Sequence, residues 1–153
     1  NRFPPTSPLG VFPCKDGWIG LTVLTPGQWH TFCELLELSE FSDIYLFQSA
    51  VGRLEGVDLL EPLICEKLLH LSAEEFFYRA QNAGVPLARV PTMEELFQVD
   101  QFVHRNAFAK IDFSDGTALQ APTIPFRLFQ TPPSFGGAVA SIGAHTHEFV
   151  DHD

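Results

Sequence analysis

The chain has 153 residues, of which 45% are hydrophobic and 18% are charged, so it has material for one hydrophobic core of ordinary size. Its formal net charge is −10, and its nine Lys and Arg residues are spread singly along the sequence. Nucleic-acid binding needs basic residues clustered on one surface, so we expect no nucleic-acid partner. No apolar run reaches the about 18 residues of a membrane span, and we expect no membrane partner either.

The cysteines and the first residue bear on the origin of the chain. Cys14, Cys33 and Cys65 are odd in number, and the sequence contains no Cys-x-x-Cys pair. This pattern favours reduced, buried thiols, and we therefore expect a cytoplasmic protein. The first residue is Asn1 rather than Met, from which we expect the chain to be a piece of a longer protein.

A β-hairpin followed by a helix is predicted near the start of the chain. Two apolar runs flank Asp16-Gly17, a pair typical of a type I′ turn because Gly takes φ > 0 without steric cost. Thr25 then suits the N-cap of a helix that continues to Leu38, with Pro26 in its first turn. We expect one face of this helix to pack on the hairpin through Trp29, Phe32 and Leu36 against Phe12, Trp18, Leu21 and Val23.

The middle of the chain is predicted to be mainly helical. Apolar spacing indicates a helix over 57–71, whereas 42–51 is ambiguous. Ser72 and Glu75 have the spacing of a capping box at the start of a further helix. That helix ends at Gly84, which suits the left-handed conformation just beyond a helix, and a short strand follows over 85–90.

The last part of the chain changes from regular structure to a linker. Thr92 and Glu95 repeat the capping-box spacing, and a second hairpin is predicted over 108–113 and 117–120. From Pro122 onward prolines and glycines accumulate, as in a linker. The predicted fold class is therefore α+β, with a small antiparallel sheet (two hairpins plus a short strand) and helices packed mainly on one face.

Four groups of residues could carry a function, and each has a simpler explanation. The densest set of metal-ligand types lies in the tail, which we interpret as a solvated acidic end rather than a metal site: His145, His147, Glu148, Asp151, His152 and Asp153. The turn accounts for Asp16 without catalysis. Cys14 and His30 are interpreted as a buried strand thiol and a helix-surface histidine rather than a nucleophile and its base. Trp18 and Trp29 are interpreted as core or interface aromatics. We predict no catalytic residue and no metal site in this chain.

Four stretches of this chain resemble the class III CoA-transferase family, which contains formyl-CoA transferase, carnitine CoA-transferase and α-methylacyl-CoA racemase. Each stretch alone is a weak signal, but together they follow the family's order. They are P-L-G-V-F-P-C-K-D-G-W-I at 8–19, Q-W at 28–29 with the helix to Leu38, G-V-P-L-A-R-V with T-M-E-E-L at 84–96, and I-G-A-H-T-H-E-F-V at 142–150.

The resemblance implies a domain organisation in which this chain is incomplete. In the family a large Rossmann-like domain holds CoA and a nucleophilic aspartate, and a smaller domain covers the active site. Residues 1–125 match the small domain, and 126–153 match the return linker and the start of a C-terminal helix. No residue here corresponds to the aspartate. The sequence also contains no glycine-rich phosphate-binding motif, so we expect CoA to be held elsewhere.

The resemblance also implies a reaction. An aspartate outside this chain attacks an acyl-CoA thioester to give a mixed anhydride, the released CoA returns to form an aspartyl-CoA thioester, and a carboxylic acid acceptor collects the CoA. The CoA thioester is a substrate, and no cofactor is expected. The partners implied are acyl-CoA and the acceptor, bound through the missing large domain, and a second copy of the chain in a homodimer. Two alternatives stay open, namely an acyl-CoA racemase of the same family and a non-catalytic binding or dimerisation module.

The one segment of this chain for which we expect a substrate-binding role is the loop before the first strand. Its predicted substrate-binding residues are Phe3, Pro4, Pro5, Thr6 and Ser7. Its prolines make it stiff, and a loop carried on a rigid hairpin is a common place for binding residues. In the family the corresponding loop faces the catalytic aspartate. It is glycine-rich in the formyl-CoA transferase branch but not here, which favours an acyl group bulkier than formyl or oxalyl.

Overall fold

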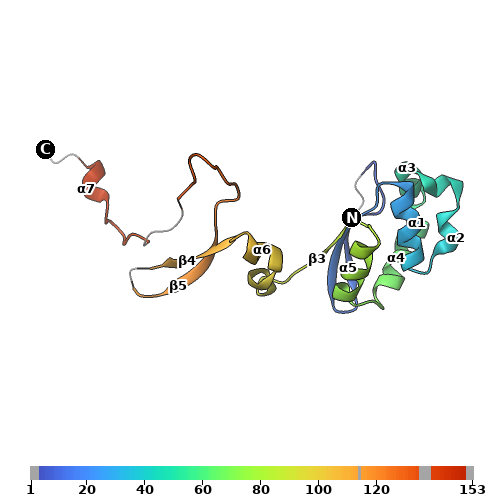
Figure 1. Cartoon of the computed structure of the whole chain (residues 1–153), viewed down its shortest axis with the longest axis horizontal. Helices are drawn as coiled ribbons and strands as arrows, with labels where there is room; N and C mark the ends of the chain where they lie inside the picture. Colours follow the sequence, from blue (N-terminus) through green and yellow to red (C-terminus); the bar gives the residue numbers. More distant parts are fainter. Residues whose placement is uncertain (1–3, 114, 135–138, 151–153) are drawn as a thin grey trace. The chain divides into compact units, whose positions relative to one another are not determined.

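Two units make up the described part of the chain in this computed structural model, which covers residues 4–113, 115–134 and 139–150. Contacts divide the chain into residues 1–91 and residues 92–153, and each unit is described separately (Figure 1). The predicted boundary between a small domain at 1–125 and a linker at 126–153 rests on the family resemblance and stays a prediction. The α+β fold class is confirmed, with helices and two small antiparallel sheets in the described residues.

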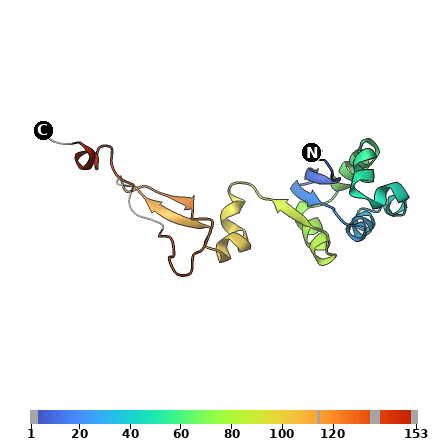
Figure 2. The ribbon, with the colours of Figure 1, turned by 90° about the horizontal axis from the view of Figure 1, so that it is seen from above.

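The first unit has a three-stranded antiparallel sheet in the order β1 (Leu9–Cys14), β2 (Gly17–Thr22), β3 (Leu87–Val90). Its helical elements are α1 (Pro26–Leu35), α2 (Ser39–Ser42), the 3₁₀ helix η1 (Tyr45–Gln48), α3 (Ala50–Glu55), α4 (Val57–Leu68) and α5 (Ala73–Asn82). Figures 1 and 2 show these helices grouped beside the sheet. The predicted arrangement of helices mainly on one face is therefore found in this unit.

The second unit contains the other predicted hairpin as a separate two-stranded sheet. Its strands are β4 (Phe108–Asp112) and β5 (Ala118–Pro122), preceded by the 3₁₀ helix η2 (Glu95–Gln98) and α6 (Asp100–His104). A short helix, α7 (Thr146–Phe149), lies near the end of the described chain. No membrane-spanning helix is found among the described residues.

The start of α1 forms as predicted, and its end shows a feature that the sequence did not indicate. Thr25 Oγ1 accepts a hydrogen bond from the Gln28 amide at 3.2 Å, and the Gln28 side chain accepts one from the Thr25 amide at 3.1 Å. The helix ends at Leu35 rather than Leu38 because Glu37 takes a left-handed φ of 58°. The Leu38 amide then bonds back to the Cys33 carbonyl at 2.8 Å, which closes the helix end.

The first hairpin has the predicted strands but a different turn. Cys14 pairs with Gly17, so the two loop residues are Lys15 and Asp16, and no residue of this turn has positive φ. The type I′ prediction is therefore wrong. Instead, bonds from outside the hairpin fix the turn, because the Lys15 amide donates to the Leu71 carbonyl at 3.0 Å.

The core lies in the first unit, and it corrects one predicted member. Every hydrophobic side chain with high burial among the described residues belongs to this unit. Trp29, Phe32 and Leu36 are at most 2% exposed, but Trp18 is 52% exposed. Because side chains alternate along a strand, Trp18 faces away from the helices when its neighbour Ile19 faces them, and Ile19 takes the buried position. The other predicted core residues are buried, namely Phe12, Leu21 and Val23.

Candidate functional site

The loop predicted to bind substrate is anchored at its C-terminal end and exposed at its other described end. Pro4 and Pro5 are exposed, Thr6 is half-buried, and Ser7 is buried. Phe3 lies outside the described residues. The following residue, Pro8, is also buried, and its carbonyl accepts a hydrogen bond from the Val23 amide at 3.1 Å. The loop is therefore held in place at Ser7 and Pro8, while its residues Pro4 and Pro5 extend into solvent.

Arg53 on α3 is the residue at this site that sequence analysis missed. It is 0% exposed, and its Nε donates to the Ser7 carbonyl at 2.6 Å. Its other described hydrogen bonds go to four backbone carbonyls, those of Phe47, Gln48, Val23 and Leu24. The guanidinium carbon also lies 5.2 Å from the centre of the Trp29 ring. The available signal in the sequence was a lone arginine within the largely apolar segment A-V-G-R-L at 50–54, which extends beyond the ambiguous stretch 42–51 and precedes the predicted helix over 57–71.

A glycine beside Arg53 permits the close packing of this site. A side-chain carbon at Gly52 would lie 1.8 Å from the Leu46 carbonyl oxygen, a distance that only a glycine avoids. The Gly52 amide donates to Ser49 Oγ at 2.9 Å, so the helix start is capped in the same place. These contacts hold α3 against the preceding 3₁₀ helix, η1, and thereby place Arg53.

Asp16 has a structural contact that explains it without catalysis. Its Oδ1 accepts a hydrogen bond from the Ala73 amide at 2.7 Å, at the first residue of α5. The predicted capping box at Ser72 and Glu75 does not form, because Ser72 makes no side-chain cap bond and Asp16 supplies the acceptor instead. This amide and the Ser72 hydroxyl lower the pKa of Asp16 from its ordinary value of 3.8.

The described cysteines are poor candidates for nucleophiles. Burial, with the nearby Asp16 carboxylate, raises the pKa of Cys14 to about 11, and burial also raises the pKa of Cys33 to about 12. Both thiols are therefore protonated at neutral pH. His30 is exposed and lies 3.4 Å from Glu34 on its own helix. All three cysteines are free.

The tail forms a local contact rather than a metal cluster within the described residues. His145 Nδ1 lies 2.7 Å from Glu148 Oε1, one helical turn away. No group of three or more metal-ligand side chains occurs in the part of the chain that the structure describes. Asp151, His152 and Asp153 fall outside it.

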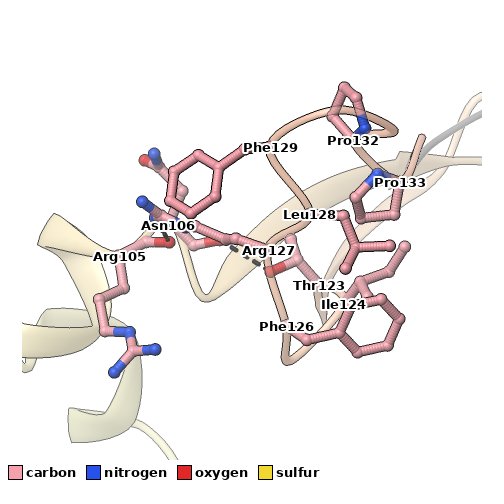
Figure 3. A pocket seen from close by; sticks show the side chains of 10 residues that line it. All are labelled: Arg105, Asn106, Thr123, Ile124, Phe126, Arg127, Leu128, Phe129, Pro132 and Pro133. Atoms are coloured by element: carbon pink, nitrogen blue, oxygen red, sulfur yellow. Dashed lines mark hydrogen bonds between the residues drawn. The ribbon is translucent and has the colours of Figure 1, made fainter.

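The larger described cavity is an open hollow of about 500 Å³ in the second unit (Figure 3). Much of its wall comes from exposed side chains, including Phe126 and Phe129, which are 55% and 98% exposed. Arg127 donates to the Arg105 carbonyl at 2.7 Å, and Figure 3 shows the Arg105 guanidinium pointing away from the other lining side chains. The polar groups do not converge, so this hollow does not define a ligand site.

A second, much smaller cavity lies beside the anchored end of the loop. It is lined by Ser7 and Pro8 together with residues of β1 and α4, and its volume is about 10 Å³. This is room for one water molecule at most. This cavity is therefore too small for an organic ligand, and the exposed described residues of the loop are Pro4 and Pro5.

Comparison with known proteins identifies the class to which these features belong. The profile of CoA-transferase family III matches residues 1–146, and the chain belongs to that family. It is 23% identical over 145 residues to a succinate–glutarate CoA-transferase of Agrobacterium fabrum, covering 95% of this chain and 36% of that protein. It is 25% identical over 144 residues to a succinyl-CoA–L-malate CoA-transferase alpha subunit of Chloroflexus aurantiacus, covering 94% of this chain and 34% of the relative.

Solved structures agree at the level of the fold. A CAIB/BAIF family protein from Brucella suis matches with a TM-score of 0.78 at 18% identity, covering 97% of this chain and 38% of that chain. The chain thus spans little more than a third of the length of these relatives. The family resemblance predicted from four sequence stretches is confirmed.

Proposed function

We propose that this chain is the small domain of an acyl-CoA:carboxylate CoA-transferase whose nucleophile lies outside it. The observation that carries the proposal is the family match over residues 1–146, together with relatives named as CoA-transferases. In the proposed reaction a carboxylate of the missing large domain attacks the thioester, which gives a mixed anhydride and releases CoA as its thiolate. The thiolate then attacks the enzyme carbonyl of the anhydride, so that the donor acid leaves and an enzyme–CoA thioester remains. The acceptor acid takes the CoA through the same two steps in reverse, which regenerates the enzyme carboxylate. This chain supplies no nucleophile and covers the reacting groups.

The names of the relatives support a dicarboxylic substrate class. They pair succinyl-CoA or succinate with glutarate, malate or mesaconate. A succinyl group is bulkier than formyl or oxalyl, in agreement with the proline-containing loop that stands here in place of a glycine-rich one. We therefore propose succinyl-CoA as the donor and a dicarboxylic acid as the acceptor.

Within this proposal, the loop over 3–7 is the part of the chain that meets the acyl group. Its described exposed residues, Pro4 and Pro5, offer rigid apolar surface without charge. Such a surface selects by shape and excludes water, while the charged ends of the substrates are met by groups elsewhere. The proposal also includes a homodimer and a cytoplasmic location, the latter supported by the cysteine pattern in the sequence.

Trapping of the enzyme thioester tests the proposed function. The complete protein that contains this chain is incubated with succinyl-CoA and no acceptor, and the adduct is located by mass spectrometry of its peptides. We expect a CoA adduct on one carboxylate outside residues 1–153, which disappears when glutarate or malate is added and the corresponding acyl-CoA forms. The isolated chain should form no adduct and show no turnover. Turnover by the isolated chain would contradict the proposal.

The same preparation distinguishes the transferase from the two alternatives, an acyl-CoA racemase and a non-catalytic binding or dimerisation module. A racemase exchanges the α-proton of a branched acyl-CoA for solvent deuterium without any acceptor acid and without a CoA adduct. A binding or dimerisation module gives neither signal. The relatives' names favour the transferase, so adduct formation with acceptor-dependent release is the expected result.

A further inference from the structure

Arg53 is a buried cation whose described hydrogen-bond acceptors are all backbone carbonyl oxygens. Burying a guanidinium is costly unless its N–H groups are satisfied, and Arg53 meets this requirement with five carbonyls. Arginine suits this arrangement because its planar fork directs donors along several fixed directions at once. A lysine ammonium is a point charge and cannot match the same set of acceptors.

The carbonyls belong to three segments that are far apart in the sequence. Nε bonds to Ser7 in the loop, one terminal nitrogen bonds to Phe47 at 2.9 Å, and the other bonds to Val23 at 3.0 Å. Arg53 thus joins the loop to the residues just after β2 and to the end of η1. Two successive carbonyls are held in this way. The Ser7 carbonyl, at the end of the loop, accepts from Arg53, and the next carbonyl, that of Pro8, accepts from the Val23 amide.

We propose that Arg53 is a positioning residue that sets the direction of the described part of the loop, residues 4–7, and thereby determines which acyl groups the enzyme accepts. The inference about acyl selection rests on the proposed function, whereas the positioning of the loop can be measured without it. Arg53 does not itself reach the substrate, because it is 0% exposed and its described donors are directed at carbonyls. It acts through Ser7.

The first arm of the test uses the 153-residue chain and no substrate. In Arg53→Lys, we expect the ¹⁵N order parameters of the Thr6 and Ser7 amides to fall from about 0.85 to below about 0.6, the range of flexible backbone. Arg53→Gln is the second variant, since its neutral planar amide fits a buried site but has only two donors. We expect the same fall there, with the amides of β2 and β3 unchanged.

Arg79→Lys is the matched control. Arg79 belongs to the same unit, donates to the Leu35 carbonyl at 3.3 Å and lies 6.0 Å from the Phe76 ring. It therefore shares a carbonyl bond and an aromatic neighbour with Arg53 but has no described contact with the loop. We expect wild-type order parameters at Thr6 and Ser7 in this variant.

The second arm uses the complete enzyme and compares a short with a bulky acyl-CoA. In Arg53→Lys, we expect KM for the bulky substrate to rise at least about tenfold more than KM for the short one, with kcat changed less than twofold. A residue that only stabilised the fold would lower the active fraction and reduce turnover of both substrates equally. Arg79→Lys should leave the ratio of the two KM values unchanged.

The outcomes separate the two proposals. Unchanged order at Thr6 and Ser7 in both variants would overturn the positioning role, and so would unfolding of both variants, because Arg53 would then act on the whole unit. A looser loop with equal KM changes for both substrates would overturn the role in acyl selection. If the complete wild-type protein transfers no CoA, the proposed function fails, and the order parameters still decide whether Arg53 positions the loop.

Discussion

Trp29 lies in the core of the first unit and makes several kinds of contact there. It is 1% exposed, its indole Nε1 donates to the Phe41 carbonyl at 3.4 Å, and Arg53 lies over its ring. A ring in this position supports the core and the loop anchor at once. Substitution of Trp29 by a smaller residue should therefore remove packing contacts in the core and also displace the Arg53 side chain.

Truncation of the α1 core face should destabilise the unit strongly. We expect Leu36→Ala to lower the free energy of unfolding by about 2–5 kcal/mol and Trp29→Ala by a similar or larger amount, through lost burial and the cavity left behind. Urea denaturation followed by circular dichroism measures both. Trp18→Ala is the control, because Trp18 is 52% exposed on the other side of the sheet. Equal losses in all three variants would show that the two sheet faces are not distinguished as described.

Asp16 should contribute to stability in a pH-dependent way. The Ala73 amide and the Ser72 hydroxyl lower its pKa below 3.8 in the folded chain. A lowered folded pKa means that the contribution is fully present above the unfolded value and is lost as pH falls through the folded value. We expect Asp16→Asn to reduce the difference in unfolding midpoint between pH 6 and pH 3. An unchanged difference between the two pH values in Asp16→Asn would contradict the role of the Ala73 and Ser72 contacts.

At the scale of elements, the loop over 3–7 and its base have separate roles. Replacing Phe3-Pro4-Pro5-Thr6-Ser7 with glycines removes the stiff surface but leaves Arg53 and β1 in place. In the complete enzyme we expect kcat/KM to fall most for bulky acyl groups, because one apolar contact in such a pocket is worth roughly 1–3 kcal/mol of discrimination. CoA binding measured separately should change little.

The matched change is Pro132 and Pro133 to glycine, in a second proline-containing segment of the described chain. It adds backbone freedom in the second unit rather than in the loop, and we expect it to leave the dependence on acyl size unchanged. If kcat/KM fell equally for short and bulky acyl groups in the loop variant, the loop would have no role in acyl selection and would serve only as a linker.

Local signals predicted local structure well. The Thr25 cap, the left-handed Gly84 with φ of 77° and the reciprocal bonds between Thr92 and Glu95 all depend on residues within a few positions of one another. Sequence spacing is sufficient for such features because their partners are fixed by chain geometry. The family resemblance was also readable, since it rests on four short stretches in a set order.

Features that depend on distant residues could not be read from spacing. Asp16 replaces Ser72 as the cap of α5 although 57 positions separate it from Ala73, and Arg53 meets Ser7 across 46 positions. Trp18 was placed on the wrong face because its strand contains large apolar residues at both parities, and only tertiary packing decides which parity is buried. The substrate role of residues 3–7 stays a prediction.

At the scale of the whole molecule, stability should be concentrated in the first unit. All buried core side chains of the described residues lie between Phe12 and Val85. We expect a fragment of residues 1–91 to unfold cooperatively with nearly the same midpoint as the full chain. In the dilute full chain, amides over 125–134 and 139–150 should exchange much faster than those of β2 and α4.

Two results would contradict the concentration of stability in the first unit. Strong amide protection over 139–150 in a dilute monomer, or loss of the folded state in the 1–91 fragment, would show that the second unit contributes to the stability of the first. Protection that rises with protein concentration would instead agree with the proposed homodimer.

The hydrogen bond between Asp16 and Ala73 also has a consequence for the order of folding events. Closing it requires the helices between the hairpin and α5 to be gathered first, because a contact across 57 positions pays a large loop entropy before it forms. We therefore expect it to be absent from the folding transition state, with a φ-value near zero. Stopped-flow measurements on Asp16→Asn should show faster unfolding and almost unchanged refolding, so the hairpin tip sets how long the native state lasts rather than how quickly it is reached.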